Sequence, residues 1–366
     1  MLGRRRKSIY VALAAALGVT GAIAGLQPVG ADEGDAETTV VATGLNNPRG
    51  LAWGPDNALY VAEAGKGGSG PCLSGPEGEA CVGLTGSVTR VWRGEQERVV
   101  KGLPSLADPT GAAAIGPSDV SLRKHRAIYI SVGNLGGPEE RAHFGRKGRA
   151  LGHLVRATPN GDWELVADLA EYEAEANPDE GVIDSNPNAV LKKGGRALVV
   201  DAAGNSVLKV DGDGDISTVA VFPNRTVTFN GEQVPMQAVP TSIVEGPDGA
   251  LYVGQLTGFP FPVGKARVYR IEPGEKPEIY ARGFTNIIDI AFDDDGDLFV
   301  LEIAHNGLLA EEPFGALIEV GSDGSRSIVL NKLNFPGGLA FDDRGRAYVS
   351  NCGVCPGDGE VLRLDP

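Results

Sequence analysis

Short apolar segments with alternating β-branched and aromatic residues recur along the chain, each preceded by a polar turn. The clearest copy is LYV at residues 251–253, which follows the turn GPDG. Such alternation, bounded by Gly, Pro and Asp, predicts β-strands joined by tight turns. Related segments occur six times, at residues 59–61, 128–130, 198–200, 251–253, 298–300 and 347–349.

Each copy belongs to a longer unit with an apolar strand before the turn and a third strand after a loop. Third strands occur six times, at residues 86–91, 152–157, 205–210, 266–271, 315–320 and 359–364. A fourth strand follows in only five units, and the sequence TTVVAT at residues 38–43 supplies a sixth at the opposite end of the chain. Six units of four short strands predict an all-β, six-bladed β-propeller whose last blade is completed by residues 38–43. The alternative is a β-sandwich or two packed β-domains.

The connections of this predicted propeller divide into short and long ones. The loops between the first and second strands, and between the third and fourth, are tight turns such as EPGEK. The second-to-third loops and the blade connections are long, and in a propeller these emerge together on the opposite face. Long loops concentrated on one face of a rigid scaffold predict a binding face there.

Alignment of the first strands places polar residues around the mouth of the axis on that face. The residues are Arg49, Ser118, Asn188 and Thr241 in one column, with Asp119 and Asp289 in the next. Asp119 and Asp289 belong to blades that lie opposite each other. Asp119, Asn188 and Asp289 are therefore candidate ligands for a divalent cation such as calcium. The alternative is that these side chains bond to backbone or water where the chain enters each blade.

A second polar set follows the LYV-type strands, and an aromatic stretch lies beside it. Glu63, Gln255 and Glu302 are the members of this set that we take as candidate ligand-binding residues, together with Arg49. Phe259 and Phe261, in the loop QLTGFPFPVG, are candidates for an apolar wall. The alternatives are loop anchors for the first group and local loop packing for the second.

The four cysteines are Cys72, Cys81, Cys352 and Cys355. The CxxC spacing of the last two suggests a structural disulfide in a propeller loop, and the first two suggest closure of the blade-1 loop. Pairing between the two loops and a zinc site of all four cysteines remain open.

The first residues have the pattern of an export signal. A basic segment, an apolar Ala-rich run and the small residues Val29, Gly30 and Ala31 predict a signal peptide over residues 1–31, and a single propeller domain over 32–366. Removal of this segment moves the net charge from −15 to −19. Such an acidic surface argues against nucleic acid as a partner. No later segment is apolar enough to span a membrane. We expect a secreted or cell-envelope monomer.

Several strings resemble one protein family over residues 38–366. These are GLNNPRGLAWGPDNALYVAEAG, CVGLTGSVTRV, SLADPTGAAAIGPSDVSL, MQAVPTSI, GPDGALYVGQLTGFPFPVGKARVYR and GFTNIIDIAFD. They resemble the ScyD/ScyE family of exported propellers. The resemblance implies the propeller class that includes NHL-repeat and gluconolactonase-like proteins, and it brings no set of catalytic residues.

Two functions are consistent with these features. The first is an exported propeller that binds a small molecule, glycan or protein on its long-loop face, as an accessory to extracellular metabolism. Loop asymmetry and the absence of a catalytic motif such as HExxH or GxSxG favour it. The alternative is a divalent-metal-dependent enzyme of the lactonase, lyase or dehydrogenase type, with its site at the axial mouth.

Overall fold

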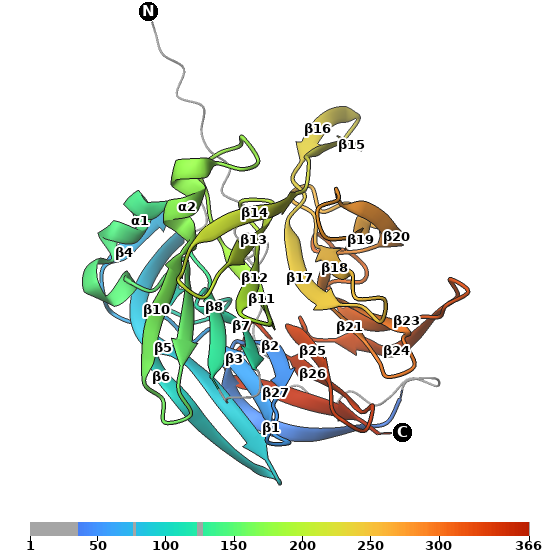
Figure 1. Ribbon diagram of the computed structural model, residues 1–366, viewed down its shortest axis with the longest axis horizontal. Coiled ribbons are helices and arrows are strands. Elements are labelled where there is room, and N and C mark those ends of the chain that lie inside the picture. Colours follow the sequence, from blue (N-terminus) through green and yellow to red (C-terminus); the bar gives the residue numbers. More distant parts are fainter. Residues whose placement is uncertain (1–35, 76–77, 123–126, 366) are drawn as a thin grey trace, which may run out of the picture.

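The computed structural model describes residues 36–75, 78–122 and 127–365. The expected signal peptide lies outside these residues. Six antiparallel sheets surround a common axis (Figure 1), so the chain forms a six-bladed β-propeller as its repeats predict. No helix within the described ranges is long and apolar enough to cross a membrane.

Each blade is built from the strands that the repeats predict. Blade 1 comprises β2 (Pro48–Trp53), β3 (Leu59–Glu63), β5 (Gly78–Trp92) and β6 (Glu95–Ala107). Blade 2 comprises β7 (Pro117–Leu122), β8 (Ile128–Val132), β9 (His153–Ala157) and β10 (Trp163–Asp168). Blade 3 comprises β11 (Pro187–Lys193), β12 (Arg196–Asp201), β13 (Ser206–Val210) and β14 (Ile216–Val221). Blade 4 comprises β17 (Pro240–Glu245), β18 (Leu251–Gln255), β19 (Ala266–Ile271) and β20 (Glu278–Phe284); blade 5, β21 (Ile287–Phe292), β22 (Leu298–Glu302), β23 (Gly315–Val320) and β24 (Arg326–Leu333).

The sixth blade joins the two ends of the chain. Its strands β25 (Gly338–Phe341), β26 (Ala347–Asn351) and β27 (Pro356–Leu364) are completed by β1 (Thr38–Asn46). β1 pairs antiparallel with β27, from Thr38 opposite Leu364 to Asn46 opposite Pro356. The closing strand is thus the predicted one, and it continues three residues beyond residue 43. β1 thus covers the outer edge of β27 and gives the last blade four strands, like the others.

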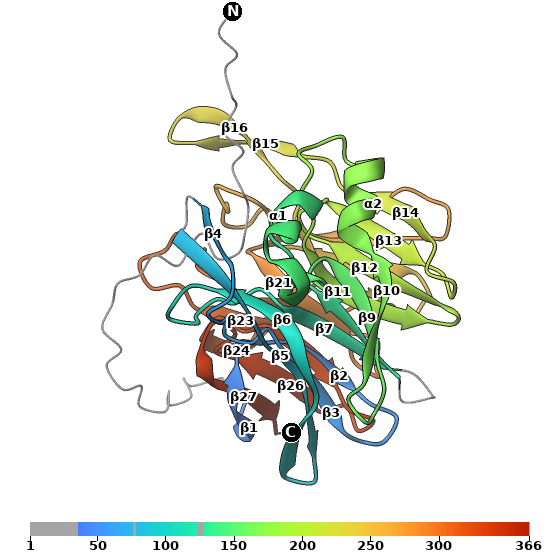
Figure 2. The same cartoon turned by 90° about the vertical axis from the view of Figure 1, so that its left-hand side faces the viewer.

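Four additional features lie in the long connections. They are the short strand β4 (Cys72–Gly75), the helix α1 (Pro138–His143) with a 3₁₀ turn at Gly145–Gly148, the helix α2 (Leu169–Ala176), and the hairpin of β15 (Arg225–Phe229) and β16 (Glu232–Met236). Figure 2 shows the hairpin standing out beyond the blades, on the side where α1 and α2 also lie. Among these features, α2 has a clear signal in the sequence, the helical composition of residues 167–176.

Both disulfides are local. Cys72 pairs with Cys81 and joins β4 to β5, while Cys352 pairs with Cys355 in the loop after β26. The structure therefore has the within-loop pairing, and neither cross-pairing nor a four-cysteine zinc site is formed.

Apolar side chains fill the interfaces between neighbouring blades. One buried cluster combines Ala42 and Leu45 of β1 with Leu51 of β2, Val61 of β3 and Val361 of β27. Leu45 is fully buried, whereas Val40 on the same strand is 48% exposed. The closing strand is therefore held by side-chain burial between blades 6 and 1 as well as by its ladder.

We expect Leu45→Ala to lower the free energy of unfolding by about 2–5 kcal/mol, because it leaves a cavity in that cluster. Val40→Ala, on the exposed face of β1, should change it by less than about 0.5 kcal/mol. Chemical denaturation of both variants measures the difference. Equal effects would show that burial at β1 does not hold the ring closed.

Candidate functional site

The polar residues predicted around the axial mouth form hydrogen bonds between neighbouring blades. The contacts are Arg49 Nη2 to Ala114 O (2.9 Å), Ser118 Oγ to Pro187 O (2.7 Å), Asn188 Nδ2 to Thr241 O (2.6 Å) and Thr241 Oγ1 to Ile287 O (2.8 Å). Each side chain donates to the main chain of the next blade or of the connection leading to it. Their polar atoms thus serve to join the inner strands.

Asp119 and Asp289 make a matched pair of contacts in opposite blades. Asp119 accepts hydrogen bonds from the N–H groups of Val120 and of Val190 in blade 3, both at 2.8 Å. Asp289 accepts from Ile290 and from Leu339 in blade 6, also at 2.8 Å. Each carboxylate therefore links its own first strand to the first strand of the following blade.

Burial makes ionisation of these two carboxyl groups unfavourable. It raises the pKa of Asp289 to about 7. Burial, with repulsion from Asp289 as a second cause, raises the pKa of Asp119 well above its ordinary value. The two groups thus interact across the axis.

The inner strands approach one another closely beside Asp119. A methyl group added at Gly50 of β2 would lie 2.1 Å from Asp119 Oδ1. Only glycine at residue 50 allows this approach. Asp119, Asn188 and Asp289 all lie in this inner layer, and each is already bonded to backbone. In the described ranges, the one group of three acidic, His or Cys side chains with ligand atoms within 4.8 Å is Cys72, Glu79 and Cys81, whose cysteines form a disulfide.

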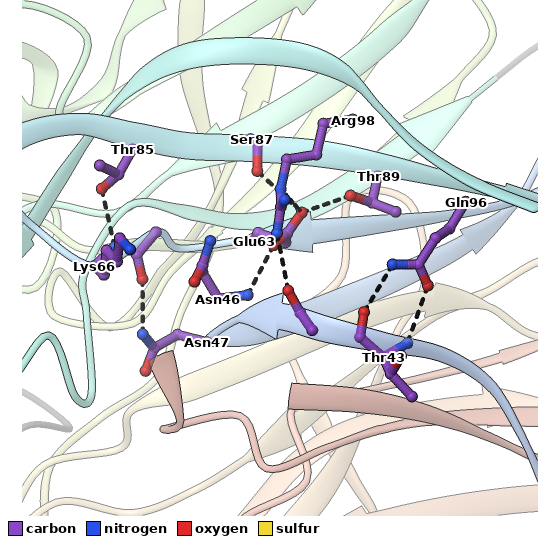
Figure 3. A network of polar contacts seen from close by, with 12 residues as sticks. Thr43, Asn46, Asn47, Glu63, Lys66, Thr85, Ser87, Thr89, Gln96 and Arg98 are labelled. Atoms are coloured by element: carbon purple, nitrogen blue, oxygen red, sulfur yellow. Dashed lines mark hydrogen bonds and ion pairs between the residues drawn. The ribbon is translucent and has the colours of Figure 1, made fainter. Parts of the chain in front are cut away.

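Glu63, in the second predicted set, is the centre of a buried network in blade 1 (Figure 3). Its carboxylate is fully buried and accepts from Asn46 N (2.7 Å), Ser87 Oγ (3.0 Å) and Thr89 Oγ1 (2.5 Å). Arg98 adds two hydrogen bonds, from Nε at 2.9 Å and from Nη2 at 2.7 Å. Every oxygen of Glu63 is thereby occupied.

The equivalent positions of blades 3 and 5 repeat part of this arrangement. Asp201 accepts from Asn186 N at 2.8 Å, and Glu302 accepts from Thr285 N at 2.6 Å. In each case the donor is the backbone just before the first strand of the blade. Glu302 also contacts His305 Nδ1 at 2.5 Å, and this hydrogen bond raises the pKa of His305.

Gln255 of blade 4 departs from this pattern. The backbone N–H of Val239, just before β17, donates to Asn205 Oδ1 (2.9 Å). Gln255 Oε1 instead accepts from Arg225 Nη2 (3.1 Å), and its buried Nε2 has no hydrogen-bond partner. The side chain is therefore not used to anchor the chain where it enters the blade.

Arg225, at the start of the hairpin, is an incompletely satisfied cation beside Gln255. Its Nη2 also donates to Lys265 O (2.6 Å), while its buried Nε has no partner. No carboxylate within the described ranges pairs with it. Burial, and secondarily the charge of Arg267, lowers the pKa of Arg225. Both effects would be relieved by an anion.

The predicted aromatic residues lie on the same part of the face. Phe229, at the end of β15, meets Phe259 edge-on with ring centroids 5.2 Å apart, and Phe259 meets Phe261 at 6.2 Å. Phe261 is buried, whereas Phe259 is 43% exposed and Val263 is 61% exposed. An accessible apolar surface is thus available beside the hairpin that carries Arg225.

Sequence reasoning did not identify Arg225. A single arginine in a blade connection carries no motif, and the hairpin that positions it was read as irregular loop. The alternation of RTVTF, followed by the turn sequence Asn230–Gly231, was the available signal.

No family model and no curated protein matches the chain. Among solved structures, the soluble aldose sugar dehydrogenase from Escherichia coli has a TM-score of 0.55 at 13% identity, covering 90% of this chain and 99% of that one. The gluconolactonase XC5397 from Xanthomonas campestris has a TM-score of 0.53 at 14% identity, covering 91% of each chain. The PQQ-bound aldose sugar dehydrogenase from Streptomyces coelicolor also has a TM-score of 0.53 at 14% identity, covering 91% and 98%. These likenesses show a shared propeller fold.

The raised pKa of Asp289 makes its contribution to stability depend on pH. A carboxyl group with a raised folded-state pKa stabilises the fold fully below its unfolded pKa, and that contribution is lost as the pH rises through about 7. Asparagine does not titrate. We therefore expect the stability of wild type relative to Asp289→Asn to fall between pH 4 and pH 8, by at most about 1.4 kcal/mol per pH unit.

Denaturation midpoints across this pH range measure the effect. The matched control is Asp343→Asn, which makes the same change at an exposed turn residue. A difference between wild type and Asp289→Asn that is constant with pH would contradict the assignment.

Proposed function

We propose that this protein is an exported propeller of the ScyD/ScyE family that binds a small organic carboxylate beside the β15–β16 hairpin. The observation that carries the proposal is a pair of buried donors without partners, Nε of Arg225 and Nε2 of Gln255, on two side chains that are hydrogen-bonded to each other. A buried donor left without a partner costs about 1–3 kcal/mol. Such a cost is expected where a ligand supplies the missing acceptor.

The chemistry of the group indicates what kind of ligand fits. Arg225 Nε and Gln255 Nε2 are both donors, so the ligand must present acceptor atoms. A carboxylate suits a guanidinium with no counter-ion, and it relieves the repulsion from Arg267. The exposed ring of Phe259, which meets Phe229 at the other end of β15 from Arg225, offers apolar surface to a ligand long enough to extend along the hairpin.

Comparison with the other blades supports a functional role for this place. Glu63, Asp201 and Glu302 use the equivalent position to accept a backbone N–H. Gln255 does not, because Asn205 takes that role in blade 4. The scaffold therefore does not require the Arg225–Gln255 arrangement.

Export is part of this proposal. Residues 1–31 have the composition of a signal peptide, and the two disulfides are suited to an oxidising compartment. We propose a monomer of one propeller domain that meets its ligand outside the cytoplasm.

We expect Arg225→Gln to weaken carboxylate binding about tenfold to a hundredfold, since a hydrogen bond to a charged group contributes about 1.5–3 kcal/mol. A thermal-shift screen of small carboxylates, including phenylacetate and glucuronate, identifies the probe, with phenylacetamide and glucose as uncharged counterparts. Titration calorimetry then compares the variants.

Arg282→Gln is the control, because it removes the same charge from an exposed position on β20. Retention of wild-type affinity by Arg225→Gln, or equal binding of acids and uncharged counterparts, would contradict a carboxylate site at the hairpin.

A second candidate is a divalent-metal-dependent enzyme of the lactonase, lyase or dehydrogenase type with its site at the axial mouth. The observation in its favour is the placement of Asp119 and Asp289 on the inner strands of opposite blades. Repulsion from Asp289 contributes to the raised pKa of Asp119, and a cation would relieve it. Asn188 would be the third ligand. For a cation to bind there, Asp119 and Asp289 would have to give up the hydrogen bonds that they accept from backbone N–H groups, or share their oxygens between these donors and the cation.

If a cation binds at the axis, calcium at a hundred times its dissociation constant should stabilise the wild type by about 2.7 kcal/mol. Asp289→Asn should lose that stabilisation, because one of the two carboxylates is gone. Thermal denaturation of chelator-treated protein, with and without calcium, measures it. Unchanged calcium stabilisation in Asp289→Asn would remove the axial site from consideration.

A further inference from the structure

Four carboxylates gather away from the axis, where α2 and the following connection lie against blade 3. They are Glu173 of α2, Asp179 and Asp184 of the connection to β11, and Asp201 at the end of β12. None of them forms an ion pair with a Lys, Arg or His among the residues that the structure describes. Acidic clusters are common on protein surfaces and do not by themselves indicate a binding site. The features that distinguish this cluster are the burial of its side chains and the oxygens that lack hydrogen-bond partners.

Glu173 is the exceptional member of this cluster. Its side chain has no exposed surface, and both carboxylate oxygens are buried without a hydrogen-bond partner. A methyl group added at Gly204 would lie 2.8 Å from Glu173 Oε2 and 3.2 Å from Asp201 Cγ. Glu173 thus points inward, to the end of blade 3 that carries Asp201.

The helix that carries Glu173 is fixed in place. The N–H groups of Leu169 and Ala170 donate to Gly152 O at 2.9 and 3.1 Å. Asp168 caps the helix by accepting from Glu171 N (3.0 Å), and Arg141 of α1 pairs with the same Asp168 at 2.6 Å. Glu173, one turn after Ala170, is therefore held inside.

Asn134 supplies a second, independent unsatisfied oxygen. It is 2% exposed, and its Oδ1 is buried without a partner. Its Nδ2 donates to Gly136 O (2.8 Å), while the N–H of Gly136 donates to Asp184 Oδ1 (3.0 Å). A methyl group added at Gly152 would lie 2.7 Å from Ala170 Cβ and 3.5 Å from Asn134 Cγ. Asn134 is thus placed between α2 and the Asp184 segment.

The ionisable groups of this cluster are all acidic, and they repel one another when ionised. Burial, followed by repulsion from Asp201, Asp179 and Asp184, raises the pKa of Glu173 to about 8. Burial and the charge of Asp201 raise the pKa of Asp184 to about 7. Asp201 Oδ2 accepts from Ser185 Oγ (2.6 Å), and Oδ1 accepts from Gly204 N (3.0 Å) as well as from Asn186 N, so Asp201 contributes charge rather than a free ligand.

We propose that Glu173 and Asn134 bind one divalent cation, calcium, where α2 and the connection to β11 lie against blade 3. All the unsatisfied atoms of these two residues are oxygens, which are the ligands that hard cations take. The described residues place no three carboxylates of this cluster within 4.8 Å of one another. The proposed shell therefore contains at most two carboxylates of this cluster and is completed by amide, main-chain and water oxygens, and calcium accepts such irregular shells more readily than magnesium does.

This site differs from the axial candidate in residues and in purpose. It joins α2 and residues 177–186 to blade 3, on the side that also carries the hairpin (Figure 2). A cation there fixes α2 and residues 177–186 on the binding face. No disulfide in the described structure links these segments to the blades. The proposal does not depend on the carboxylate site at Arg225.

The test is calcium titration of the full chain after chelator treatment, by calorimetry and by thermal shift. We expect one calcium per chain at this site, a raised melting temperature, and at least tenfold weaker binding in Glu173→Gln. Glu175→Gln is the matched control, since it makes the same change two residues away on the exposed face of α2. It should bind calcium as the wild type does.

Folding of the main variant can be checked independently of metal. Without calcium, Glu173→Gln should be at least as stable as wild type at pH 8, because it removes a buried charge repelled by its neighbours. Asn134→Leu, as a second variant, should also bind calcium at least tenfold more weakly. The proposal is overturned if wild type binds no calcium, if Glu173→Gln binds it with wild-type affinity, or if binding is lost in Asp289→Asn but kept in Glu173→Gln.

Discussion

A closed circle of hydrogen bonds around the axis is the constraint on which the other features depend. Side chains at the start of the first five blades donate to, or accept from, the backbone of the next blade or of the connection before it: Arg49 towards blade 2, Ser118 and Asp119 to blade 3, Asn188 to blade 4, Thr241 to blade 5, and Asp289 to blade 6. Ser350, on the second strand of blade 6, completes the circle by donating to Arg49 O at 2.8 Å. Apolar burial between sheets is not directional, so it allows blades to slide. The circle fixes their register. β1 joins blade 6 to blade 1, because it pairs with β27 by hydrogen bonds and continues along the chain into β2.

This constraint explains why polarity at a propeller mouth is poor evidence of a binding site. Inner strands carry backbone groups that no sheet partner satisfies, because each strand's neighbour on the axis side is another blade. Side chains must supply those partners. Glu63, Asp201 and Glu302 lie on the second strands of their blades, and they too accept hydrogen bonds from backbone N–H groups. A site is better recognised where a side chain at such a position is not required, and Gln255 is that case.

The fold was predictable from the sequence because it depends on repetition. Six copies of an LYV-type strand, and one fourth strand displaced to the N-terminus, suffice to deduce the ring and its closure. The positions of Asp119 and Asp289 in opposite blades also follow from strand counting. Arg225 and Glu173 could not be found in this way. Their significance lies in missing partners, and a missing partner is a property of the surroundings in space rather than of a residue's spacing along the chain.

The unsatisfied side-chain atoms on which the two proposals rest are opposite in kind. Beside the hairpin they are donors, Arg225 Nε and Gln255 Nε2; beside α2 they are acceptors, in Glu173 and Asn134. Random imperfections of packing would leave donors and acceptors mixed within each place, and they would then tend to bond to one another. This separation by kind agrees with the two proposals, in which each group takes a partner of opposite character from outside the chain. A cation that fixes the connections near blade 3 and an anion held at blade 4 are the simplest pair of partners that satisfy both.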